Sequence, residues 1–131
     1  VRLWKKGCIE LRACGKVLAD IAREHYKCQV PEIFVKYGDQ SDVMDVVRMC
    51  ALATATEVTI LDPVCVVLSG GVTQMPGFPL EYFVRNVKEN LRMPEPRLFA
   101  DCSCIARSGG RGDWSSVECL CCAEITVFCQ I

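Results

Sequence analysis

The sequence lacks several features that would point to a function directly. Its charges nearly cancel, with 15 Lys and Arg against 16 Asp and Glu and a net charge of −1. This balance lacks the basic surplus that attracts nucleic acids or anionic membranes, so we expect neither as a partner. No apolar run reaches the roughly 18 residues that a membrane-spanning helix needs. The first residues contain no apolar core of a signal peptide, so we expect a cytoplasmic location.

The composition is that of a folded domain with an uneven distribution of cysteine. The chain has 131 residues, of which 51% are hydrophobic and 24% charged, which suffices for one buried core. Five of its 11 cysteines lie before residue 102, and the other six lie from residue 102 onward. An odd number of cysteines without a secretory signal argues against a disulfide scaffold. The composition therefore changes near residue 101.

The apolar spacing predicts an α/β order of elements. Helical periodicity covers residues 10–25, and Pro31 opens a short helix that continues to Tyr37. Ser41 is expected to cap a long helix that ends before Asp62 and Pro63. The β-branched run over residues 64–69 indicates a buried parallel strand, because it lacks polar alternation. A helix around residues 80–91 and a strand over 97–101 follow, and no element is predicted beyond Asp101.

Three segments between residues 7 and 101 together resemble the ROK family of sugar kinases. They are Gly7-Cys8-Ile9-Glu10, the Ala-Thr-Ala-Thr-Glu-Val helix that leads into Leu61-Asp62-Pro63, and Val66-Val67-Leu68-Ser69-Gly70-Gly71-Val72. Met75-Pro76-Gly77-Phe78-Pro79 and its following helix extend the likeness. The resemblance implies part of the C-terminal lobe of an actin-like, hexokinase-like ATPase fold. It also implies transfer of the γ-phosphoryl group of ATP, with Mg²⁺, to a hexose, D-allose in particular, and a homodimeric parent protein.

The resemblance implies roles for four residues. Glu10 matches a glutamate that accepts hydrogen bonds from sugar hydroxyls, although alone it also fits a solvated charge at a helix N-terminus. Gly70 and Gly71 match a turn that the adenosine part of the nucleotide approaches, although a Gly-Gly pair often forms an ordinary turn. Cys8 matches the last cysteine of a structural zinc site. Val1 and Leu3 replace two other ligands of that site and its upstream histidine is missing, so the site is incomplete and Cys8 also fits a small hydrophobic residue.

Both ends of the chain depart from the family pattern in a way that a shifted reading frame explains. Codons for Val-Arg-Leu-Trp at the start, read one base later, can encode Cys-x-Cys-Gly, which is the missing part of the zinc motif. Codons for Arg111 to Ser116, read one base later, can encode Gly-Val-Ile-Gly-Ala-Ala, a helix start that family members carry. We therefore expect a family segment over residues 1–101 and an out-of-frame, cysteine-rich tail over 102–131. The alternative for the tail is a metal site built from Cys102, Cys104 and the cysteines at 119–122.

The resulting expectation is a fragment of an ATP-dependent hexose kinase. The family's Asp-x-Gly-x-Thr phosphate loop and catalytic-base aspartate are absent from these 131 residues. Phosphoryl transfer needs positioned phosphates, metal and a base, so we expect the chain alone to be inactive. The alternative is a non-catalytic remnant or packing and dimerisation module. Repressors of the same family share this lobe, but their DNA-binding helices do not occur in this sequence.

Overall fold

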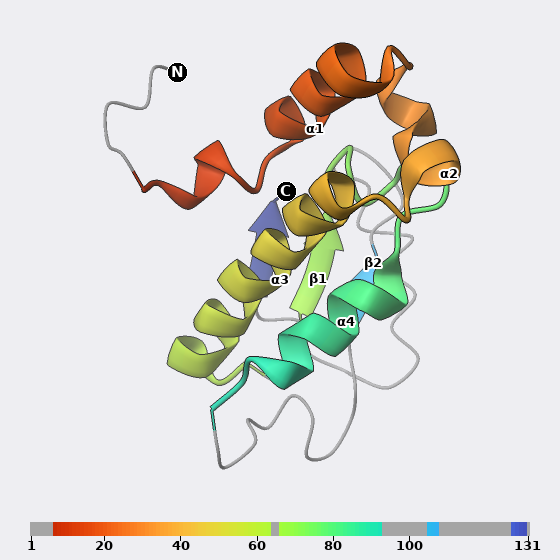
Figure 1. Cartoon of the computed structure of the whole chain (residues 1–131). Coiled ribbons are helices and arrows are strands. Elements are labelled where there is room, and N and C mark those ends of the chain that lie inside the picture. Colours follow the sequence, from red (N-terminus) through yellow and green to blue (C-terminus); the bar gives the residue numbers. More distant parts are fainter. Residues whose placement is uncertain (1–6, 64–65, 93–104, 108–126, 131) are drawn as a thin grey trace.

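The described part of the chain forms a small parallel sheet covered on one face by two helices (Figure 1). The structure is a computed structural model and describes residues 7–63, 66–92, 105–107 and 127–130. Strand β1 (Val66–Ser69) lies between β2 (Ile105–Arg107) and β3 (Val127–Gln130), and both neighbours run parallel to it. Parallel strands beneath packed helices are compatible with the α/β class that the sequence predicts.

The core lies between β1 and the two helices α3 (Ser41–Leu61) and α4 (Leu80–Glu89). The apolar stripe predicted for α3 is confirmed, because its members are all buried: Val43, Val46, Val47, Cys50 and Val58. Phe83 and Val87 of α4 are fully buried, as are Val66 and Leu68 of β1. The long helix ends at Leu61 and is capped by Asp62, which has a left-handed backbone (φ 47°) and whose N–H donates to the Val58 carbonyl oxygen. No helix in the described part of the chain is both long and apolar enough to cross a bilayer.

The first predicted helix is shorter than its sequence pattern. A single 3₁₀ turn, η1 (Ile9–Leu11), precedes α1 (Gly15–Ile21), which continues as a π-helical turn, η2 (Ala22–Tyr26). The predicted start at residue 10 is therefore wrong, since Cys14 is extended (φ −135°, ψ 163°) and separates η1 from α1. Gly15 then passes so close to Val72 that a Cβ on it would lie 3.3 Å from Val72 Cγ2. The extended conformation of Cys14 thus separates the two helical segments, and Gly15 packs beside Val72. Helical periodicity in the sequence does not predict such a tertiary contact.

The remaining elements follow the predictions with two corrections. A 3₁₀ turn, η3 (Val30–Glu32), and helix α2 (Ile33–Tyr37) confirm the short helical segment. Ser41 is the first residue of α3 and Gln40 takes the cap position, without a side-chain cap hydrogen bond, so the predicted Ser41 cap is wrong. Two strands, β2 and β3, occur beyond Asp101, where none was predicted, because they are defined by pairing with distant β1. The strand predicted over residues 97–101 lies outside the described residues.

Candidate functional site

The Gly70–Gly71 turn leaves backbone open at the end of β1. Gly70 has φ 119°, a conformation that residues with a Cβ rarely adopt. The turn is closed by Thr73, whose Oγ1 donates to the Gly70 carbonyl oxygen at 3.0 Å. Gly71 is exposed, and a Cβ built on it would meet nothing within 4 Å. A ligand could therefore approach the main chain at Gly71 without displacing any described atom.

The turn stands at the carboxyl end of the parallel sheet, where α/β proteins bind ligands. The start of α1 and the N-terminal end of α3 lie at this same end of β1 (Figure 1). The 3.3 Å approach of Gly15 to Val72 joins the N-terminal segment to the residues that follow Gly71. Gly15, five residues after Glu10, therefore lies beside the residue that follows the Gly70–Gly71 turn.

Glu10 occupies the centre of the η1 turn and is exposed. Within the described residues its carboxylate has no hydrogen bond and no ion pair. Within the part of the chain that the structure describes, no hydrogen bond joins Glu10 to Gly70 or Gly71. A carboxylate left without a protein partner is available to accept hydrogen bonds from hydroxyl groups of a ligand.

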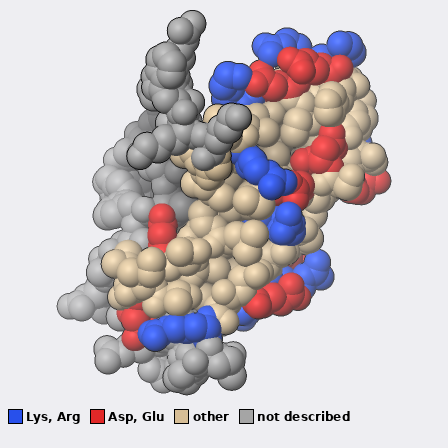
Figure 2. Space-filling model, turned by 60° about the vertical axis from the view of Figure 1, so that its left-hand side comes forward, with Lys and Arg blue, Asp and Glu red and all other residues tan. Residues whose placement is uncertain are grey.

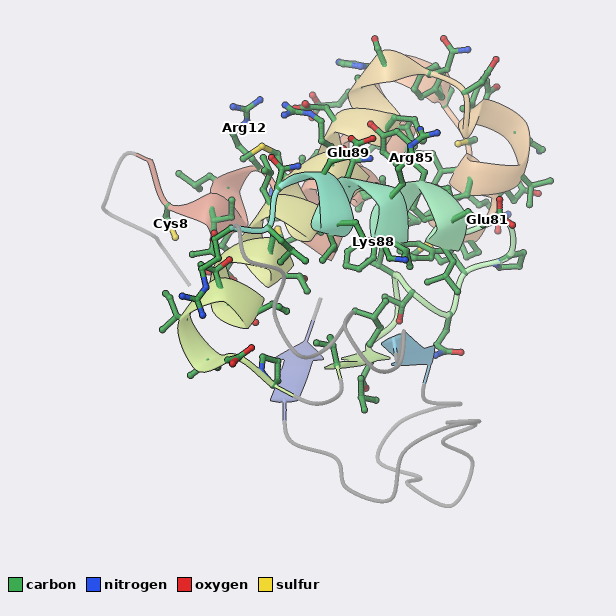
Figure 3. The ribbon with its side chains drawn as sticks, turned by 90° about the horizontal axis from the view of Figure 1, so that it is seen from below. Cys8, Arg12, Glu81, Arg85, Lys88 and Glu89 are labelled. Carbon is green, nitrogen blue, oxygen red and sulfur yellow. The ribbon has the colours of Figure 1, made fainter. Side chains whose placement is uncertain are left out.

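Cys8 lies directly before η1, is half-buried and is a free thiol. In Figure 3 its side chain and that of Arg12 leave the N-terminal ribbon in different directions. Among the described residues no three His, Cys, Asp or Glu side chains come close enough to hold a metal ion. Since a structural zinc site needs four ligands, the described residues do not fit zinc at Cys8. Residues 1–6 and the cysteines of the tail at 102–122 lie outside the described part, and of Cys129 only the backbone is described.

Sequence reasoning missed a charged cluster that links the Glu10 segment to α3. Arg12 Nη2 donates to Asp45 Oδ2 at 2.8 Å, and Arg48 donates to Asp45 Oδ1 from Nε at 3.1 Å and from Nη2 at 2.6 Å. The hydrogen bonds and charge of Arg48, aided by Arg12, hold the pKa of Asp45 below its ordinary value. The spacing of Asp45 and Arg48 on one helix was readable from the sequence, but the distant Arg12 was not.

A second cluster, around Asp42, was also missed. His25 Nδ1 lies 2.8 Å from Asp42 Oδ2, and the Tyr26 hydroxyl donates to Asp42 Oδ1 at 2.7 Å. Burial raises the pKa of Asp42, but the hydrogen bonds from His25 and Tyr26 outweigh it and the pKa is lowered. The bond to Asp42, together with burial, raises the pKa of Tyr26 to about 12. Tyr26 also stacks on Tyr37 with ring centroids 4.2 Å apart, so the cluster joins three helical segments.

A surface hollow of about 430 Å³ lies on α4, away from the predicted site residues. Figure 3 labels the four charged side chains of this helix face. The described lining consists of one face of α4: Leu80, Glu81, Val84, Arg85, Lys88 and Glu89. None of Cys8, Glu10, Gly70 or Gly71 contributes to it. The hollow therefore offers no support for the predicted sugar or nucleotide contacts.

The charges on the surface are mixed. Figure 2 shows Lys and Arg beside Asp and Glu over the face that it presents. The ion pairs include Lys36 with Glu32 at 2.8 Å and Arg23 with Asp20 at 2.7 Å, both on exposed helix surfaces. Such exposed pairs contribute at most about 1 kcal/mol each to the folding free energy, so they add little to the stability of the fold.

Comparison with known protein families identifies the chain. Residues 5–112 match the ROK family, which covers most of the 131 residues and contains every residue of the site described above. The family includes ATP-dependent sugar kinases, and its fold is that of sugar kinases and actin-like ATPases. The chain belongs to the ROK family.

Proposed function

We propose that the chain is part of an ATP-dependent hexose kinase that transfers the γ-phosphoryl group of ATP to the 6-hydroxyl of D-allose. The observation that carries the proposal is the open Gly70–Gly71 turn at the carboxyl end of β1, in a chain that belongs to the ROK family. In this proposal the chain supplies part of the C-terminal lobe of the kinase.

The proposed role of Glu10 is recognition of the sugar. Its exposed carboxylate has no partner within the described residues, so its oxygen lone pairs are free to accept hydrogen bonds from hydroxyl groups. Hydrogen bonds to an ionised carboxylate are about twice as strong as those between neutral groups. Glu10 would therefore both bind the hexose and fix its orientation.

The proposed role of Gly70 and Gly71 is to let the adenosine part of ATP lie against the main chain. The open space beside Gly71 is compatible with such a group, because no described heavy atom outside Gly70, Gly71 and Val72 lies within 4 Å of the place that a Cβ would take. When bound, ATP supplies the phosphoryl group that is transferred. The described residues bring no three candidate metal ligands together, so we assign no Mg²⁺ ligand within them.

We also propose that the family segment ends near residue 101 and that the cysteine-rich tail is read out of frame. The family match begins at residue 5, next to the proposed first shift, which supports that shift, whereas its end at residue 112 lies eleven residues beyond the proposed second one. Sequencing the locus tests the idea, since a confirmed shift predicts family sequence in the second frame at both ends. Absence of any such sequence in the shifted frames would refute it.

The kinase proposal includes a homodimer, as the family resemblance implies, and a cytoplasmic location. A coupled assay of ADP release by the full-length protein, with Mg²⁺, ATP and a panel of hexoses, tests it. We expect turnover with D-allose that exceeds turnover with its epimers. Turnover with a different hexose alone would refute the sugar assignment, and no turnover with any hexose would favour the non-catalytic packing module.

A further inference from the structure

The turn that carries Glu10 has little to hold it in place by itself. Its backbone hydrogen bonds are local: the N–H groups of Leu11, Arg12 and Ala13 donate to carbonyls of Cys8 and Ile9. The turn buries no residue, and Ile9 and Leu11 are 43% and 49% exposed. Among the described residues, apolar packing therefore contributes little to how η1 is held on the rest of the structure.

Two side-chain contacts attach the end of this turn to α3. The Cys50 thiol donates to the Ala13 carbonyl oxygen at 3.5 Å, a weak bond. The stronger contact is the charge-assisted bond from Arg12 to Asp45 at 2.8 Å. Arg12 is two residues from Glu10, so this bond acts almost directly on the Glu10 turn.

Arg48 holds the carboxylate of Asp45 in place independently of Arg12. Both donors from Arg48 go to Oδ1, which leaves Oδ2 for Arg12. Asp45 and Arg48 lie one helical turn apart on α3, and the neighbouring Val46 and Val47 are buried in the core. The acceptor for Arg12 therefore lies on α3, which buries more residues than any other described helix.

We infer that Asp45 is a positioning residue for Glu10: through Arg12 it fixes the η1 turn on α3 and so sets the place of the sugar-binding carboxylate. This inference rests on the proposed sugar-binding role of Glu10. The affinity of a carboxylate for a polyol depends on the position of that carboxylate. Loss of the Arg12–Asp45 bond, here called the tether, therefore lowers the affinity for the sugar although Asp45 does not touch it.

The chain contains a matched control for this tether. Asp20 is also a carboxylate that accepts from two basic residues, Lys16 and Arg23. It resembles Asp45 in exposure, with 32% against 36% of the side chain accessible. Both partners of Asp20 lie on its own helical segment, so Asp20→Asn removes a similar ion pair without releasing η1.

The experiment compares Asp45→Asn, Arg12→Gln, their double variant and Asp20→Asn in the full-length protein. Amide hydrogen exchange of residues 9–13 measures the turn, and calorimetric titration measures the dissociation constants of D-allose and of Mg²⁺-ATP. We expect Asp45→Asn to speed exchange of the turn and to weaken D-allose binding, each about two- to fivefold, as for an exposed ion pair. Mg²⁺-ATP binding and the urea midpoint should stay close to those of Asp20→Asn.

The double variant should be no worse than either single variant, because both remove the same bond. If the wild-type protein binds D-allose but Asp45→Asn changes neither amide exchange nor D-allose affinity, the positioning role of Asp45 is overturned and the proposed function is not. Equal weakening by Asp20→Asn would also overturn it, since the effect would then be general. Wild-type protein that binds no hexose would instead refute the proposed function, and the sugar-positioning role would fall with it.

Discussion

The two glycines of the proposed nucleotide turn should respond differently to the same substitution. Gly70 has φ 119°, where a residue with a Cβ is strained, and such strain costs about 1–3 kcal/mol. Gly71 does not share the positive φ, and a Cβ there would meet nothing within 4 Å. Gly71→Ala should therefore stabilise the fold by about 0.4–1 kcal/mol, through the lower entropy of the unfolded chain.

Urea denaturation followed by circular dichroism separates these two effects. With a slope of about 1–3 kcal/mol/M for a small protein, Gly70→Ala should lower the midpoint by roughly 1 M, whereas Gly71→Ala should leave it unchanged or raise it slightly. The slopes of the three proteins should agree, because neither change alters how much surface unfolding exposes. An unchanged midpoint for Gly70→Ala would contradict the backbone conformation at this position.

Nucleotide binding then distinguishes a functional turn from an ordinary one. If adenosine lies against the main chain at Gly71, a methyl group there fills the space that the ligand needs, at a cost of about 1–3 kcal/mol. Gly71→Ala in the full-length protein should therefore raise the dissociation constant of Mg²⁺-ATP about tenfold or more, and Gly71→Val should raise it further. D-allose affinity serves as the control and should hardly change. Wild-type ATP affinity in the more stable Gly71→Ala variant would refute the nucleotide role of the turn.

Three further predictions concern the sugar contact, the isolated chain and the Asp42 cluster. Glu10→Gln in the full-length protein turns one hydrogen-bond acceptor into a donor, so we expect kcat/KM for the sugar to fall about ten- to a hundredfold while KM for ATP stays nearly constant. Steady-state kinetics measure both constants. Wild-type kinetics in this variant would mean that Glu10 is only a surface charge. The 131-residue chain assayed alone should show no ADP release above background with D-allose, because it lacks the phosphate loop and base, and any turnover would contradict this. Because the pKa of Tyr26 is raised to about 12, its neutral form stabilises the fold fully below pH 10, and this contribution is lost as the pH rises through about 12. Absorbance at 295 nm should therefore show a late tyrosine transition that Asp42→Asn moves toward pH 10, and an identical titration in the variant would disprove the Tyr26–Asp42 bond.

The elements that the sequence predicts well are those whose pattern is local. The buried positions of α3 recur every three or four residues from Val43 to Val58, over about four turns, and burial of one face follows from that spacing alone. The uninterrupted apolar run of β1 predicts a strand buried between neighbours, and both of its partners are parallel. Strands β2 and β3 escaped prediction because each is only three or four residues long and is defined by pairing with a segment far away in the chain.

Only part of the candidate site can be predicted from the sequence, for a related reason. Glu10, Gly70 and Gly71 were found through a resemblance to a family, and their chemistry follows from residue type. Whether Glu10 can act as a sugar contact, however, depends on what holds its turn in place, and that is decided by Arg12 meeting Asp45 from 33 positions away. Asp45 reads in the sequence as a charge suited to the start of a helix, and its ion pair with Arg12 is seen only in the folded structure. The residues predicted to touch the ligands can therefore be named from the sequence, whereas the residues that set their geometry emerge from the tertiary contacts.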